Sequence, residues 1–187
     1  SNVQLGVPVA INIENGIAAM ALAQLGGVSN EDIKTGMASF RGVDRRFDFK
    51  IKTDKVVYLS DYAHHPEEIK QSILSMRALY EGKRLTGIFQ PHLYTRTRDF
   101  YQEFADALSI LDEVILTEIY PARELPIEGV TSHLIYDNLK EGVAKQIIEK
   151  TDIIEFVKSR DFDVLVILGA GDLDNRCDEI AEILNSK

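Results

Sequence analysis

Short apolar runs alternate with amphipathic segments along most of this chain, and that alternation limits the fold more than any other feature. The runs 56–60, 85–89 and 164–168 consist mostly of β-branched and other apolar residues, which predicts buried strands. The segment 66–79, which follows the first run, carries apolar residues at helical spacing. Strands that alternate with helices are typical of βαβ units. We therefore expect an α/β fold with a mostly parallel sheet flanked by helices.

The other predicted elements continue this pattern from residue 47. The run 47–52 alternates apolar and polar residues, as a strand with one solvated face does. Further strands are expected at 113–117 and near 144–148, and further helices at about 99–111, 131–139, 151–159 and 174–184.

Residues 1–44 differ from the rest because they contain helical patterns and no predicted strand. One helix is expected over 15–25, stopped by two glycines, and a second from a cap at Ser29 or Asn30 to about Phe40. Two short helices bury too little apolar surface to be stable alone. We therefore expect this segment to be the end of a domain whose remainder lies outside the sequence.

The composition argues against several functions. A net charge of −9 disfavours binding to nucleic acid or to acidic membranes, both of which require basic surfaces. No apolar run approaches the roughly 20 residues that span a bilayer, and no signal peptide is visible, so we expect no membrane association. The single cysteine, Cys177, cannot form an internal disulfide and is expected to be a small apolar helix residue. A reducing cytoplasm fits this cysteine content best.

Polar loops follow four of the predicted strands at their carboxyl ends. These loops are residues 61–65, 91–98, 120–124 and 169–172. In a parallel sheet the carboxyl ends lie along one edge, where ligands bind in crevices. Any α/β domain has polar loops there, but these are enriched in histidine and arginine, which favours the binding of a small anion.

The first loop, Asp61-Tyr62-Ala63-His64-His65-Pro66, crowds an aspartate, a tyrosine and two histidines into a turn from strand to helix. Pro66 suits the first turn of the helix, where its missing N–H has no cost. The composition of the turn predicts a ligand site. The alternative interpretation is a polar surface loop.

The second loop, 91–98, brings an imidazole and guanidinium groups together. Arg96 or Arg98 could clamp a carboxylate, and His92 could donate a hydrogen bond or shuttle a proton. The alternative is that a threonine caps the next helix while the arginines pair with acidic neighbours. Arginine is disfavoured at the positive start of a helix, so we favour a ligand.

Two further patterns have both a functional and a structural interpretation. The pair Arg45-Arg46 could bind phosphate or carboxylate, or could be a surface pair on a linker. The run 169–171 lacks the third glycine of a dinucleotide fingerprint and is expected to form a tight turn.

Three histidines together with Asp61 could in principle ligate zinc. The adjacent His64 and His65, however, cannot easily point at one ion, and no His-Glu-x-x-His motif or cysteine pair is present. We therefore expect no metal site in this chain.

The four loops together resemble those of a known family. They read Asp61-Tyr62-Ala63-His64-His65-Pro66, Phe89-Gln90-Pro91-His92-Leu93-Tyr94-Thr95-Arg96-Thr97-Arg98-Asp99, Tyr120-Pro121-Ala122-Arg123-Glu124 and Gly169-Ala170-Gly171-Asp172. In these runs the chain resembles the UDP-N-acetylmuramate–L-alanine ligases, members of the Mur ligase family of bacterial peptidoglycan precursor synthesis. The resemblance covers essentially the whole chain, but only the carboxyl-terminal part of such an enzyme.

The resemblance implies a domain organisation and an activity. Residues 1–44 would be the helical tail of a central ATPase domain, and 45–187 a Rossmann-like carboxyl-terminal domain that contacts the amino acid and the nucleotide. The whole enzyme would use ATP and Mg²⁺ to join L-alanine to UDP-N-acetylmuramate through an acyl phosphate. The family's phosphate loop is absent from this sequence. The fragment alone is therefore expected to be inactive, with UDP-N-acetylmuramate and most of the Mg²⁺ site held by the missing domains.

The resemblance also implies roles for eight residues. Those that match nucleotide contacts are Asn12, Asn15, Arg46 and Asp61, and Arg46 is also the expected catalytic residue because it matches an arginine that approaches the phosphates. Those that match the L-alanine site are Tyr62, His64, His92 and Arg96. In this assignment Arg96 holds the carboxylate of alanine, while His92 and Tyr62 orient its amine.

The sequence departs from the family pattern at three positions. Val9 and Ile11 stand where the family usually has glycine and histidine, so the contact with adenine there is in question. Leu93 stands where some members have another arginine, so alanine recognition would rest on fewer cationic groups.

Three other functions stay open from the sequence. One is the related ligase that recycles murein tripeptide. The second is a non-catalytic module that binds a nucleotide or an amino acid. The third is a metal-dependent hydrolase that uses His64, His65 and His92.

Overall fold

The computed structural model describes residues 2–6 and 10–187, except for the side chains of residues 10 and 11. The chain divides into two compact units, residues 1–44 and residues 45–187. Within the described residues, no helix is both long enough and apolar enough to span a membrane.

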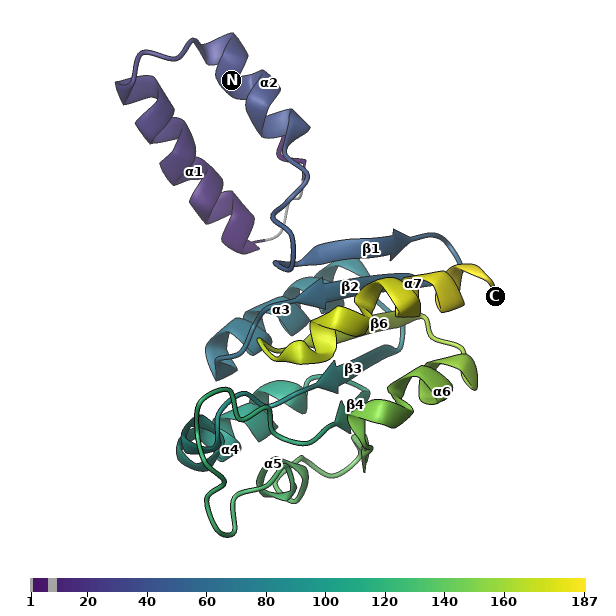
Figure 1. Ribbon diagram of the computed structural model, residues 1–187. Coiled ribbons are helices and arrows are strands. Elements are labelled where there is room, and N and C mark those ends of the chain that lie inside the picture. Colours follow the sequence, from purple (N-terminus) through teal and green to yellow (C-terminus); the bar gives the residue numbers. More distant parts are fainter. Residues whose placement is uncertain (1, 7–9) are drawn as a thin grey trace. The chain divides into compact units, whose positions relative to one another are not determined.

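The amino-terminal unit is a pair of helices, α1 (Ala10–Leu25) and α2 (Asn30–Ser39) (Figure 1). The cap predicted for α2 is confirmed, because the Oγ of Ser29 accepts a hydrogen bond of 3.1 Å from the backbone N–H of Asp32. Helix α1 begins earlier than the predicted residue 15. Residues 10–14, which precede the predicted start, contain no proline or glycine that would break a helix, and propensity alone does not fix where a helix starts.

The carboxyl-terminal unit is built on one six-stranded sheet. In spatial order β1-β2-β6-β3-β4-β5, its strands are β1 (Asp48–Lys52), β2 (Val57–Asp61), β6 (Val164–Leu168), β3 (Leu85–Phe89), β4 (Glu113–Leu116) and β5 (Ala144–Ile147). Strand β1 is antiparallel to β2, and every other pair of neighbours is parallel. The predicted mostly parallel sheet is confirmed, and the last strand of the chain lies in its interior.

Four of the strands end level with one another. Asp61 pairs with Leu168, Leu168 with Phe89, and Phe89 with Leu116. The loops that leave β2, β6, β3 and β4 therefore begin side by side at the carboxyl edge of the sheet.

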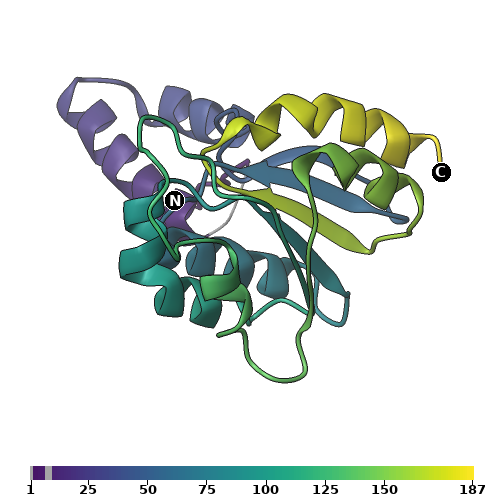
Figure 2. The ribbon, with the colours of Figure 1, turned by 60° about the horizontal axis from the view of Figure 1, so that its bottom comes forward.

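Helices cover both faces of this sheet, as expected for a parallel sheet. On one face, α3 (Pro66–Leu79) packs against α4 (Tyr94–Leu108), and α4 packs against the short α5 (His133–Tyr136). On the other face, α6 (Ile153–Lys158) packs against α7 (Cys177–Asn185) (Figure 2). Single 3₁₀ turns, η1 (Lys150–Asp152) and η2 (Asp172–Arg176), precede α6 and α7.

The core explains why the strands have apolar residues at successive positions. Every residue of β3, β4 and β6 is buried. Beneath α6 and α7, Tyr58 and Leu165 belong to the same apolar cluster as Ile180 and Cys177. The predicted role of Cys177 as a small buried helix residue is confirmed, and burial raises the pKa of its thiol.

Three predicted helices have different bounds in the structure. Helix α4 begins at Tyr94, whereas the sequence predicted a loop as far as Arg98, so the prediction of a loop at 94–98 is wrong. Helix α5 is confined to a single turn within the predicted 131–139. The predicted helix at 174–184 begins as the η2 turn and becomes α-helical only at Cys177.

Candidate functional site

The four polar loops converge at the carboxyl edge of the sheet. Backbone hydrogen bonds join them where they leave their strands: Gly169 N donates to Asp61 O at 3.1 Å, Gln90 N to Leu168 O at 3.2 Å, and Thr117 N to Phe89 O at 3.1 Å. The predicted convergence of strand-end loops is therefore confirmed.

An aromatic row crosses this edge and consists of Tyr62, His64, His92 and Tyr120. The ring centroids of Tyr62 and His64 are 5.2 Å apart, and those of His64 and His92 are 6.1 Å apart. The ring of Tyr120 stacks on His92 at 5.7 Å. Three loops that follow β2, β3 and β4 thus supply one continuous row of rings.

The start of α3 fixes His64. Pro66 occupies the first turn of the helix, and the carboxylate of Glu68 accepts the backbone N–H groups of His64 at 3.1 Å and of His65 at 3.3 Å. The Nδ1 of His64 lies 3.0 Å from the carbonyl oxygen of Tyr62. Since a carbonyl can only accept, this contact assigns a proton to Nδ1, and in the neutral ring Nε2 is then an acceptor.

His92 has the opposite tautomer. Its Nδ1 lies 3.4 Å from Nη1 of Arg96, and a guanidinium can only donate, so Nδ1 accepts and Nε2 carries the proton. Burial and the positive charge of Arg96 lower the pKa of His92 below its usual value. His92 is therefore a neutral hydrogen-bond donor at the edge of the sheet.

Gln90 connects the second loop to the last loop. It is 1% exposed, its Nε2 donates to the Oδ1 of Asp172 at 3.1 Å, and its Oε1 accepts the N–H of Leu173 at 3.1 Å. Lys150 forms an ion pair with the same aspartate at 2.6 Å. Although burial opposes ionisation, the hydrogen bonds from Lys150 and Gln90 keep the pKa of Asp172 below its usual range.

Glycine is required where the last loop passes Gln90. A Cβ on Gly171 would lie 2.1 Å from the Oε1 of Gln90 and 3.1 Å from the Cβ of Tyr120. Gly169, with a φ of +129°, would place its Cβ 2.7 Å from the backbone oxygen of Gln90. The predicted tight turn at 169–171 is therefore packed directly on the loop that carries His92.

The two arginines of the pair at 45–46 have different environments. The guanidinium of Arg45 lies 4.8 Å from the centroid of the Tyr62 ring, and its Nε lies 2.8 Å from Oδ2 of Asp174. The side chain of Arg46 is exposed and makes no ion pair or hydrogen bond with any other described residue. Arg45 is thus part of the structure of the unit, whereas Arg46 is available to a ligand.

Backbone strain is concentrated near the same edge. The described non-glycine residues with positive φ are Arg45, Phe47, Leu93 and Ala122. Three of them are next to residues of the site in the sequence or share a loop with one. Arg45 comes directly before Arg46, Leu93 comes directly after His92, and Ala122 lies in the same loop as Tyr120. Strained backbone persists where the surrounding structure holds it and is frequent at functional sites.

Asp61, the remaining candidate of the first loop, ends β2 in a half-buried position. Its Oδ1 accepts the N–H of Ala63 at 3.1 Å, and burial raises the pKa of its carboxyl group. The candidates Asn12 and Asn15 belong to α1 in the other unit. Of the departures from the family pattern, Val9 and the side chain of Ile11 lie outside the described residues, and Leu93 is the residue before α4.

Two other side chains near the row, those of His65 and Arg98, face other partners. The ring of His65 lies 5.2 Å from that of Phe100, apart from the His64–His92 pair. Arg98 is exposed and pairs with Asp99 at 2.7 Å, as the structural interpretation of the second loop required. Within residues 2–6 and 10–187, no group of three or more histidine, cysteine, aspartate or glutamate side chains could hold a metal ion.

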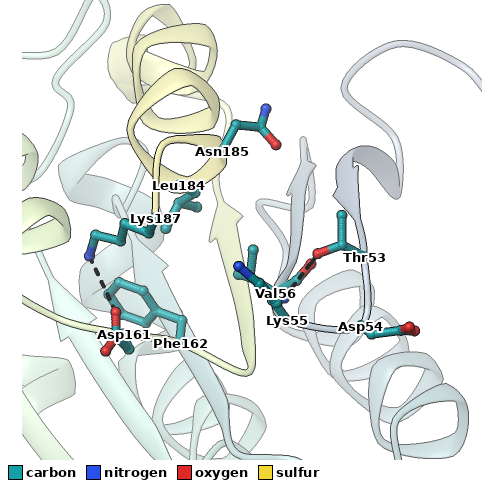
Figure 3. Close-up of a pocket in the computed structure, with 9 residues that line it drawn as sticks. All are labelled: Thr53, Asp54, Lys55, Val56, Asp161, Phe162, Leu184, Asn185 and Lys187. Carbon is teal, nitrogen blue, oxygen red and sulfur yellow. Dashed lines mark hydrogen bonds and ion pairs between the residues drawn. The ribbon is translucent and has the colours of Figure 1, made fainter.

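A separate hollow of about 590 Å³ lies at the opposite, amino end of strands β2 and β6 (Figure 3). Its walls come from the turn before β2, the loop before β6 and the end of α7, and none of the aromatic row lines it. Its Lys187 ammonium already contacts the Val157 carbonyl oxygen at 2.8 Å and the Asp161 carboxylate at 3.8 Å. The charge of Lys187 in this hollow is therefore already paired.

Sequence reasoning did not assign a role to three residues that build the site: Tyr120, Gln90 and Glu124. Tyr120 stacks on His92, Gln90 joins two loops, and Glu124 bonds to Thr95 at the start of α4. All three lie in or beside the loops at the carboxyl ends of the strands. The expectation that ligands bind at this edge of a parallel sheet, which pointed to His64 and His92, could therefore also have pointed to them.

Residues 45–171 match the family model described as Mur ligase, glutamate ligase domain. The match covers more than half of the sequence, and the chain therefore belongs to the Mur ligase family.

Within that family the chain is similar to the UDP-N-acetylmuramate–L-alanine ligase of Phocaeicola vulgatus. The two are 69% identical over 186 residues, which are 100% of this chain and 41% of that protein. The chain thus spans about two fifths of the length of the curated relatives it matches.

Two solved structures have the same fold. The UDP-N-acetylmuramate-alanine ligase of Thermotoga maritima is 28% identical with a TM-score of 0.81, over 98% of this chain and 40% of that one. A murein peptide ligase of Psychrobacter arcticus is 19% identical with a TM-score of 0.67, over 99% of this chain and 39% of that one. At that identity the second structure shows a shared fold and nothing more.

Proposed function

We propose that this chain is the carboxyl-terminal part of an ATP-dependent ligase that joins L-alanine to UDP-N-acetylmuramate through an acyl phosphate. The observation that carries the proposal is the contact of Arg96 with His92 and of His92 with His64 at the carboxyl edge of the sheet. The 69% identity to an enzyme named for this reaction supports the choice of substrates.

The half-buried Arg96 suits the carboxylate of a small amino acid. It sits in the first turn of α4, and one of its guanidinium nitrogens already donates to His92. A guanidinium has five donors, so the others stay available for two parallel bonds to a carboxylate. In this proposal Arg96 fixes the carboxylate end of alanine.

The aromatic row suits the amine end. The Nε2 of His64 is an acceptor and the Nε2–H of His92 is a donor, as their partners at Nδ1 dictate. An amine that must attack a carbonyl group needs an acceptor to orient it, and His64 provides one next to the Tyr62 ring. His92 and Tyr62 then set the angle of the amine relative to the carboxylate held by Arg96.

We assign nucleotide contacts to Asn12, Asn15, Arg46 and Asp61. The exposed guanidinium of Arg46, with no partner among the described residues, fits a phosphate group. The carboxylate of Asp61 can accept hydroxyl protons of a ribose. Arg46 is the residue we propose as catalytic, because a guanidinium stabilises charge that develops on a transferring phosphoryl group.

Magnesium, when bound with ATP, neutralises charge on the phosphates. The described residues contain no acidic cluster of the size that a metal site needs. Most of the magnesium site, and the binding of UDP-N-acetylmuramate, would therefore belong to domains outside this chain. For the same reason the chain by itself should not form the amide bond.

The exposed apolar surface of the amino-terminal unit supports the proposal that the ligase has further domains outside this chain. Helix α1 exposes several large apolar side chains, namely Ile13, Ile17, Leu22 and Leu25. A groove of about 410 Å³ between α1 and α2 is lined partly by Ile17, Met20 and Ile33. A domain whose core is complete seldom leaves so much of one helix uncovered. We propose that residues 1–44 are the helical end of the central ATPase domain, and 45–187 the carboxyl-terminal domain of the ligase.

The test uses the full-length enzyme that contains this chain, assayed for amide formation with ATP, UDP-N-acetylmuramate and L-alanine. Arg96→Ala should raise the KM for alanine about tenfold to a hundredfold, the effect of losing a charged hydrogen-bonded pair, while the KM for ATP changes little. Arg98→Ala is the matched control, since Arg98 is exposed and pairs only with Asp99.

An alanine KM that is the same in Arg96→Ala and Arg98→Ala would remove Arg96 from the amino-acid site. A wild-type enzyme that ligates murein tripeptide and not L-alanine would identify it as the recycling ligase. Amide formation by residues 1–187 alone would contradict the proposed division between domains.

A further inference from the structure

Helix α4 begins without a cap of its own. The residue before it, Leu93, has a φ of +73° and an apolar side chain that makes no cap hydrogen bond. The first N–H groups of a helix have no partner within the helix and need an acceptor from elsewhere. Asn, Asp, Ser or Thr usually supplies that acceptor at this position, and leucine cannot.

Glu124 supplies the missing acceptor from the neighbouring loop. Its Oε2 accepts the backbone N–H of Thr95 at 2.9 Å, and its Oε1 accepts the hydroxyl of the same threonine. Its negative charge also lies at the positive end of the helix dipole. The hydrogen bonds from Thr95 lower the pKa of Glu124 below its usual range, so the carboxylate stays ionised.

The loop of Glu124 is itself tied to the loop of His92. Tyr120 N donates to Pro91 O at 2.8 Å, and Leu93 N donates to Tyr120 O at 3.0 Å. Within the loop, Glu124 N donates to Pro121 O at 2.9 Å, which closes a turn and fixes the carboxylate. The backbone of Tyr120 therefore holds Pro91 and Leu93, the residues on both sides of His92.

The capped turn is the one that carries Arg96. Residues 94–98 are helical, and Arg96 in the first turn contacts the Nδ1 of His92, which lies just before the helix. From local sequence alone the same residues are expected to form a loop, in which no helical turn would hold Arg96 beside His92.

The recorded contacts of the Glu124 carboxylate are with Thr95 at the start of α4. Both of its carboxylate oxygens accept hydrogen bonds from Thr95. These hydrogen bonds connect the carboxylate to the site through the start of the helix.

We propose that Glu124 is a positioning residue of the amino-acid site. It caps α4 from the neighbouring loop and thereby holds Arg96 against His92 in the geometry that receives the amino acid's carboxylate. The capping of α4 stands without the proposed function, while the effect on amino-acid binding rests on it.

The experiment compares three variants of the full-length enzyme: Glu124→Ala, Glu124→Gln and Glu128→Ala. Glu128 is an exposed glutamate of the same loop and is the matched control. Two quantities are measured: hydrogen exchange of a peptide that spans residues 93–100, and the KM values for alanine and for ATP.

Loss of the cap in Glu124→Ala should speed exchange in this peptide by about threefold to thirtyfold, the range expected for removal of a helix cap. The KM for alanine should rise by a similar factor, with the KM for ATP nearly unchanged. Glu124→Gln keeps one acceptor oxygen and should fall between wild type and Glu124→Ala in both measurements. Glu128→Ala should match wild type.

Unchanged exchange at residues 93–100 in Glu124→Ala would overturn the cap. Faster exchange with an unchanged alanine KM, in an enzyme whose Arg96→Ala variant does lose alanine affinity, would overturn the link between cap and site. A raised alanine KM without faster exchange would mean that Glu124 touches the substrate, which also overturns the proposal. If Arg96→Ala leaves the alanine KM unchanged, the proposed function fails, and the exchange measurement still decides the cap.

Discussion

The imidazole rings of His64 and His92 lie with their centroids 6.1 Å apart and their planes at 72°. Each ring has its tautomer set at Nδ1, by the Tyr62 carbonyl in one case and by Arg96 in the other. The pair therefore presents one acceptor and one donor nitrogen side by side. Two histidines that were both protonated could not do this, because both would only donate.

His92 should titrate below the usual value of 6.5, because burial and the charge of Arg96 disfavour its protonated form. Between the lowered pKa and 6.5 the unfolded chain binds more protons than the folded chain. His92 thus contributes stability that increases as the pH rises through this window and is lost as the pH falls through it. An NMR titration of the imidazole signals measures the pKa directly.

Arg96→Ala should move the pKa of His92 upward, because a positive neighbour is removed, whereas Arg98→Ala should leave it where it is in the wild type. A His92 that titrates at or above 6.5 in the wild-type chain would contradict the assigned tautomer and its contact with Arg96.

Arg45→Ala should lower the free energy of unfolding of the chain by about 1–2 kcal/mol. The substitution removes the cation–π contact with Tyr62 and one partner of the half-buried ion pair with Asp174. Arg46→Ala should change it by less than about 0.5 kcal/mol, as expected for an exposed side chain without a partner. Urea unfolding measures both, and equal losses would refute the different roles of the two arginines.

Gln90→Leu should destabilise the chain by about 1–3 kcal/mol, because it leaves the N–H of Leu173 and the carboxylate of Asp172 without their buried partner. Gln71→Leu is the comparison, since Gln71 bonds only to Glu67 on the exposed face of α3. It should change stability by less than about 0.5 kcal/mol. Similar unfolding midpoints for the two variants would show that the hydrogen bonds of Gln90 to Asp172 and Leu173 do not stabilise the fold.

Gly171→Ala should destabilise the chain by about 1–3 kcal/mol, because its new methyl group would meet Gln90 Oε1. Gly36→Ala should stabilise α2 by up to about 1 kcal/mol, since nothing lies within 4 Å of the new Cβ and alanine favours a helix. Thermal unfolding followed by circular dichroism compares them. In the double variant Gln90→Ala/Gly171→Ala the losses should be less than additive, and full additivity would show that the two residues do not clash.

The strands and the start of α3 were predictable because their signals are local. Pro66 and the apolar spacing that follows it define α3 within one short segment, and its predicted bounds are confirmed. The runs at 85–89 and 164–168 are likewise strands with the predicted bounds. For the same reason the sequence alone predicts the four polar loops at one edge of the sheet.

The start of α4 could not be predicted because its cap, Glu124, comes from a distant part of the sequence. The different environments of Arg45 and Arg46 were equally hidden, since only the fold shows that Asp174 and Tyr62 engage the first arginine. Stacking of Tyr120 on His92 depends on which strands are neighbours, and the spacing of residues does not give strand order.

Strand β6 is the last of the six strands to leave the ribosome, yet it lies between β2 and β3. A nascent chain that has not reached Val164 has two separate half-sheets with unpaired edges, which are the surfaces that aggregate or recruit chaperones. His64 and His92 belong to different half-sheets, so they can meet only after this strand is inserted. The His64–His92 pair at the carboxyl edge of the sheet therefore forms only once residues 164–168 have joined it.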